Sequence, residues 1–153
     1  MIDLLRPLAA YLKTQLRATL AATGHNASGR LSQSVEVVVR RAMEGFVIEG
    51  SALTYGVYLE HGRKAGAKGV PIDALLDWIH QRNIEIEGMK ERSVAFMFQA
   101  SIRRKGIEPA RWIERTLEQA ETRIDTDIET AMGKYVDAMI DTIFTQIQDH
   151  ADH

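Results

Sequence analysis

The sequence predicts an α+β fold: a small antiparallel β-sheet flanked by an N-terminal helix, inserted short helices and a long C-terminal helical segment. Near the start leucines recur every three or four residues, after residue 34 valines alternate with polar residues, and from Trp112 an apolar helical period runs almost to the end. At 153 residues, 45% of them apolar, the chain suits one globular core. We divide it into a main domain, residues 1–121, and an acidic helical extension, residues 122–153, packed on that domain or on a neighbour.

The first segment has the pattern of an amphipathic helix with one apolar face. The leucines on that face are Leu5, Leu8, Leu12, Leu16 and Leu20. Pro7 fits the first turn, where a missing N–H costs little, and Gly24 is placed to end the helix.

A β-hairpin is expected next. Residues 24–29 have loop composition, and Val35, Val37 and Val39 then alternate with polar residues, which indicates a strand with one buried face. Val38 is the one position that breaks this alternation. A turn at residues 43–45 leads to the apolar run 46–48, the expected second strand. Residues 53–60 are compatible with either an extended segment or a short helix, because Gly56 leaves the pattern ambiguous.

Residues 61–69 contain three glycines and three cations, which predicts a flexible basic loop. Pro71 then opens a short helix, and the spacing of apolar residues predicts a further helix from Arg92 to Lys105 with Gly106 as its stop.

The apolar period that begins at Trp112 continues to Ile147. One unbroken helix of this length would exceed the diameter of the domain and would need a partner. Thr122-x-x-Asp125 and Thr126-x-x-Glu129 both resemble capping boxes, so we expect a break near residues 122–127.

Charge and composition exclude several classes of protein. The chain has no cysteine, which removes disulfide scaffolds, thiolate metal sites and cysteine nucleophiles. No apolar run approaches the roughly 18 residues of a membrane span, and the first residues lack the pattern of a signal peptide, so we expect a protein made and used in a cytoplasm, or built there into something larger.

Charge is distributed unevenly along the chain. Residues 1–111 carry 16 Lys and Arg against 11 Asp and Glu, whereas residues 112–153 carry 3 against 10, giving net charges of +5 and −7. Such asymmetry suggests two surfaces for different partners, or one contact repeated head to tail; a merely well-solvated tail helix would show it too.

The sequence contains no motif of a known catalytic or cofactor site. The His-Glu-x-x-His zinc pattern, the phosphate-binding Walker pattern and the nucleophile elbow are all absent. His150 and His153 lie in an acidic terminus that we expect to be frayed rather than metal-binding. We therefore expect no enzyme, no cofactor and no metal.

Two basic clusters raise the question of nucleic-acid binding. Arg63, Lys64 and Lys68 lie in the glycine-rich loop, and residues 103–105 are all cationic. Such clusters neutralise phosphates, but cations at a helix C-terminus also interact favourably with the helix dipole. Both interpretations stay open.

Three segments, in this order along the chain, resemble the head–tail joining, or tail-completion, proteins of tailed bacteriophages and prophages. The first, Gly29-Arg30-Leu31-Ser32-Gln33-Ser34-Val35, is similar to a Gly-Arg-Leu-x-x-Ser-Ile pattern that leads into a strand. The second, Tyr55-Gly56-Val57-Tyr58-Leu59-Glu60-His61-Gly62, is similar to a Tyr-Ala-x-Tyr-Val-Glu-x-Gly pattern followed by a variable loop. The third, Pro109-Ala110-Arg111-Trp112-Ile113, resembles an Arg-Pro-Phe-Leu element that opens the last helix, with the proline displaced. The resemblance covers roughly residues 5–120.

The resemblance implies a structural virion protein at the head–tail interface, made in the host cytoplasm. Copies would form a ring of roughly six or twelve subunits between portal or adaptor and tail tube, with non-specific DNA in the channel and no membrane. It assigns subunit or channel contacts to Tyr58, Glu60, His61, Gly62, Arg63, Lys64 and Lys68. Arg111, Trp112 and Ile113 are interface candidates, although core packing is the default for a tryptophan.

Two other classes of function remain as alternatives. One is a small DNA-associated binding or regulatory homo-oligomer that uses the basic clusters. The other is an enzyme, which would need a site formed only in the fold from Glu60, His61 and a distant aspartate.

Overall fold

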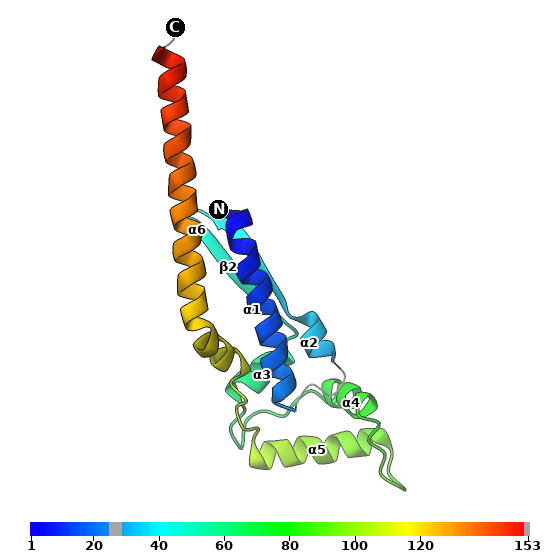
Figure 1. Cartoon of the computed structure of the whole chain (residues 1–153). Helices are drawn as coiled ribbons and strands as arrows, with labels where there is room; N and C mark the ends of the chain where they lie inside the picture. Colours follow the sequence, from blue (N-terminus) through cyan, green and yellow to red (C-terminus); the bar gives the residue numbers. More distant parts are fainter. Residues whose placement is uncertain (25–28, 152–153) are drawn as a thin grey trace.

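The computed structural model describes residues 1–24 and 29–151, with side chains through residue 146. Its elements are α1 (Ile2–Ala22), α2 (Arg30–Ser34), β1 (Glu36–Ala42), β2 (Gly45–Ser51), α3 (Tyr55–His61), α4 (Ile72–Gln81), α5 (Glu91–Lys105) and α6 (Trp112–Ala151). Most of the chain is helical, and α1 packs on one face of a two-stranded antiparallel sheet, which confirms the α+β class (Figure 1).

Helix α1 packs on both the hairpin and the first half of α6, and it contributes more buried apolar residues than any other element. All five leucines of its predicted apolar face are buried. Gly24, at φ +71°, follows the end of α1 as expected. The placement of Pro7 in the first turn is wrong, because the helix already begins at Ile2 and the Met1 carbonyl accepts the N–H groups of Leu4 and Leu5.

The predicted hairpin is confirmed. β1 and β2 pair in the register Val39↔Ile48, with the turn at Met43 and Glu44. Val37 and Ile48 are partly buried on the face that packs toward α1 and α6, as period-two alternation requires.

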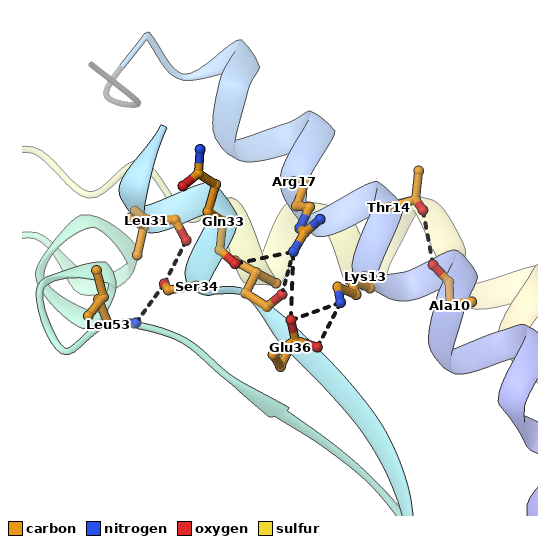
Figure 2. A network of polar contacts seen from close by, with 10 residues as sticks. Ala10, Lys13, Thr14, Arg17, Leu31, Gln33, Ser34, Glu36 and Leu53 are labelled. Atoms are coloured by element: carbon orange, nitrogen blue, oxygen red, sulfur yellow. Dashed lines mark hydrogen bonds and ion pairs between the residues drawn. The ribbon is translucent and has the colours of Figure 1, made fainter. Parts of the chain in front are cut away.

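A polar network attaches α1 to the start of β1 (Figure 2). Lys13 Nζ donates to both carboxylate oxygens of Glu36, at 2.8 and 2.7 Å, and the Arg17 guanidinium donates to the carbonyls of Gln33 and Val35. These residues precede or begin the strand, so the network fixes where α2 ends and β1 starts.

Two short helices flank the hairpin. The segment before β1 forms α2, one helical turn, instead of leading directly into the strand. The ambiguous segment after β2 forms α3, in which Gly56 is buried against Leu31 and the indole of Trp112. A Cβ at Gly56 would lie 3.1 Å from Leu31 Cδ1, so close approach of the helices favours glycine here.

Helices α4 and α5 pack on each other around a core separate from that of α1. Leu75, Ile79, Val94 and Ala95 form its centre, and Trp78 meets Phe98 edge-on with ring centroids 5.1 Å apart.

The expected break near residues 122–127 is wrong, because α6 runs unbroken for 40 residues, about 60 Å at ~1.5 Å per residue. Thr126 Oγ1 donates to the Thr122 carbonyl one turn earlier, at 2.8 Å, and so does not cap a new helix. Arg123 also pairs with Asp127 across this turn at 2.8 Å, and Ala120 and Ala131 on either side are buried. Among the described residues, no helix is both long and apolar enough to cross a membrane.

Candidate functional site

The two basic clusters predicted from the sequence come together in the fold. Arg63 and Ile107 form an isolated antiparallel bridge, with N···O distances of 2.7 and 2.8 Å, and Gly66 N donates to the Arg103 carbonyl at 2.7 Å. These bonds hold the basic loop against the C-terminal end of α5. Residues about 40 positions apart in the sequence thereby form one surface.

We call this surface the basic patch. Its members are the exposed cations Lys64, Lys68, Arg103, Arg104 and Lys105. Within the described part of the chain, no carboxylate lies within 4 Å of any of these charged groups. Unpaired cations at this density give a positive potential that attracts a polyanion or an acidic protein surface.

Arg63 has a different role from its neighbours in the loop. Its guanidinium lies 5.1 Å from the centre of the Tyr58 ring and donates to the carbonyl of Lys68. It therefore holds the loop in shape and connects it to α3.

Backbone geometry accounts for Gly62, another predicted contact residue. Its φ is +66°, and a Cβ there would lie 2.5 Å from the Ile107 carbonyl oxygen. Glycine is therefore required for the chain to leave α3 and pair with residue 107.

The carboxylate of Glu60 is used in hydrogen bonds within the subunit. Its side chain is 8% exposed, and its two oxygens accept the backbone N–H groups of Ile113 at 2.7 Å and Glu114 at 3.1 Å. These are free N–H groups of the first turn of α6, where the helix dipole favours a negative charge. Nothing in the sequence marks this pairing, because the partners are more than 50 positions apart.

His61 lies beside Glu60 in a surface depression of about 480 Å³, which Pro109, Arg111 and Glu114 also line. Arg111 adopts φ +49° and approaches Glu114 at 3.6 Å. Since both oxygens of Glu60 already accept amide hydrogens, this carboxylate is poorly placed to act as a general base for the enzyme alternative. Among the described residues, no group of three or more His, Asp or Glu side chains is arranged to hold a metal ion.

Trp112 lies in the core. It is 2% exposed, and its indole N–H donates to the Gly56 carbonyl at 3.1 Å. Ile113 is half-buried against the same cluster, so of the three predicted interface residues Arg111 alone is exposed.

An uncovered run of apolar side chains lies on the second half of α6, outside the predicted site residues. Contacts with the body end near Ala131, which is buried, and Tyr135, whose ring meets Phe46 at 6.5 Å. Beyond them α6 continues alone past the start of α1 (Figure 1). Six side chains, 44–62% exposed, form what we call the apolar stripe: Met132, Val136, Met139, Ile140, Ile143 and Phe144. The helical period predicted Met132, Val136, Ile140 and Ile143, but not Met139 or Phe144, and periodicity does not say whether the subunit covers these side chains.

Comparison with known proteins adds no relative: the chain matches no protein-family model, no curated protein and no solved structure.

Proposed function

We propose that this protein is a structural virion component of a phage or prophage, a ring-forming neck or tail-completion subunit that joins head to tail. The observation that carries the proposal is the apolar stripe on the projecting end of α6. Apolar surface held in water on a lone helix is unfavourable, and contiguous exposed patches of this kind mark association sites. The stripe therefore supports a role in assembly.

Charge and motif order support this kind of assembly. The acidic end of α6 and the basic patch lie at opposite ends of the molecule, an arrangement that suits a head-to-tail contact repeated around a ring (Figure 1). The order of the three segments that resemble head–tail joining proteins points to the virion neck, between portal or adaptor and tail tube. A basic patch beside a DNA channel would act through non-specific phosphate attraction.

The test is the mass of the purified protein by light scattering over a concentration series, with electron microscopy of any large species. A closed ring of roughly six or twelve copies, alone or on a portal or tail-tube partner, is expected. A stable dimer that neither forms rings nor joins such a partner would contradict the proposal.

The basic patch favours a second candidate, a small DNA-associated homo-oligomer. Duplex DNA binding that weakens steeply with salt would support it, since each neutralised phosphate contributes about one unit to the slope of log K against log salt. Lys64→Glu with Lys68→Glu should then weaken binding, whereas the same charge change at Arg6 and Lys134, exposed residues outside the patch, should not. Equal loss in both double variants would indicate only a net-charge effect.

A further inference from the structure

We propose that the apolar stripe of α6 docks on the outer face of α5 of a second copy of this chain. This inference rests on the proposed function and names the two surfaces that would join neighbouring subunits.

The surface offered by α6 combines apolar and acidic side chains. The stripe residues follow a helical spacing of three and four, with adjacent pairs at 139–140 and 143–144, so they line one broad side of the helix over about three turns. This side is distinct from the side that buries Ala120 and Ala131 against the body. Asp137 and Asp141, both exposed and one turn apart, flank the stripe, and neither makes an ion pair within the described part of the chain.

The surface offered by α5 combines apolar and basic side chains. Val94 and Ala95 face α4 and are buried, so the opposite side of α5 is the outer face. There Phe96 is 50% exposed and Met97 is 43% exposed. Ala100 follows on the same side, and Arg103 and Arg104 extend it toward the end of the helix. An apolar centre with a charged margin is the usual composition of an interface.

Charge decides which pair of surfaces meets. Two α6 helices side by side would bring together segments whose charge from residue 112 onward is −7, whereas α5 ends in three consecutive cations. Pairing α6 with α5 places Asp137 and Asp141 near Arg103 and Arg104 and covers both apolar surfaces at once. Because each copy carries one surface of each kind, the contact is heterologous and adds subunits in a chain that a suitable rotation closes into a ring.

The absence of cysteine allows a direct cross-linking test on the full-length protein. Ile140→Cys and Met97→Cys place one thiol on each proposed surface, at exposed positions whose replacement leaves the core intact. Mixed and treated with a short bismaleimide, the two variants should give a covalent heterodimer that neither gives alone. Val57→Cys on α3, at a comparably exposed position, is the matched control and should not react with Ile140→Cys.

Three outcomes would overturn the proposal. Homodimers from Ile140→Cys alone would show α6 pairing with α6. Equal reaction of Val57→Cys and Met97→Cys with Ile140→Cys would show unspecific contact. Absence of any product at concentrations where the protein is oligomeric would place the interface elsewhere.

Charge reversal provides an independent test. Arg103→Glu with Arg104→Glu should lower the cross-linking yield with Ile140→Cys about tenfold, and Asp137→Lys with Asp141→Lys should do the same. Combining the two reversed partners should restore the yield, and failure to restore it would count against this register.

These results separate the inference from the proposed function. Rings that form while positions 97 and 140 do not cross-link would leave the neck function standing and overturn the α5–α6 contact. Specific cross-linking in open filaments that never close would support the contact and contradict the ring.

Discussion

At the scale of single residues, the most consequential side chain is Glu60. It comes from α3, yet it stabilises α6 by accepting two N–H groups of the first helical turn. Beside it, the Trp112 indole bonds back to the Gly56 carbonyl, so α3 and the start of α6 hold each other through buried groups. The orientation of α6 relative to the body therefore depends on this junction.

Replacing Glu60 with glutamine should lower the free energy of unfolding by about 2 kcal/mol, because the neutral amide accepts more weakly and its NH₂ group faces an amide donor. Urea unfolding monitored by circular dichroism measures the change. Glu118→Gln, an exposed position further along α6, makes the same change in charge and should cost less than ~0.5 kcal/mol. Equal effects of the two substitutions would show that the cap contributes nothing specific.

The ion pair between α1 and β1 makes a pH-dependent prediction. The hydrogen bonds from Lys13 lower the pKa of the Glu36 carboxyl below its ordinary value, and the charges of Lys13 and Arg17 act in the same direction. Since the folded pKa is the lower one, this contact stabilises the fold at neutral pH. Its contribution is lost as the pH falls through the folded pKa.

NMR titration of the Glu36 carboxyl should therefore give a pKa below the ordinary glutamate value in the native protein and a higher one in Lys13→Met. If Glu36 titrates identically in both proteins, the contact is not formed in solution.

At the scale of elements, the length of α6 is the main result that differs from expectation. Two Thr-x-x-acid patterns predicted a break, but packing of Ala120 and Ala131 and bonding of Thr126 to the preceding turn keep the helix continuous. Gly133 is the weakest point that remains, since glycine in a helix interior lacks the side chain that restricts the unfolded backbone.

Gly133→Ala should raise the free energy of unfolding by about 1 kcal/mol. Apart from the adjoining backbone of α6, a Cβ at this position would meet no atom within 4 Å, so no steric cost offsets the gain. Gly24→Ala is the contrasting variant, because Gly24 is equally open but has φ +71°, and it should destabilise the protein instead. Chemical denaturation at low protein concentration measures both, and a destabilised Gly133→Ala would indicate that α6 bends there.

Elements were predictable from the sequence where their periodicity repeats several times. The five leucines of α1 and the alternating valines of β1 each fix a face, and the structure buries or half-buries those faces. Short elements such as α2 and α3 offer one or two turns of pattern, too few to distinguish helix from strand.

The candidate surfaces were predictable only in part, because adjacency comes from the tertiary fold. The loop cations and the end of α5 were visible as separate clusters, and the Arg63–Ile107 bridge joins them. The pairing of Glu60 with the start of α6 likewise joins residues far apart in sequence. The apolar stripe is exposed because the rest of the subunit does not extend along the second half of α6, and periodicity alone does not show this.

At the scale of the whole molecule, α4 and α5 form a unit that packs chiefly on itself. Their core is separate from the cluster that contains Leu16, Leu20 and Trp112, and the links to the body include the Arg63–Ile107 bridge and the Arg82 bond to the Gly24 carbonyl at 3.3 Å. A unit held by few bonds can open while the body stays folded.

Native-state hydrogen exchange should therefore show two levels of protection. Val94→Ala removes buried methyl groups at a position that is 1% exposed, so it should destabilise the α4–α5 unit by about 2 kcal/mol. The amides of Leu75 and Ile79 should then exchange roughly 30-fold faster, while those of Leu16 and Leu20 keep their rates. Leu20→Ala is the reciprocal variant and should accelerate exchange in α1. If each substitution accelerates exchange in both groups of amides equally, the chain unfolds as one unit. In that case α5 would be presented to a neighbouring subunit by a single rigid body, and not by an α4–α5 unit that can open separately.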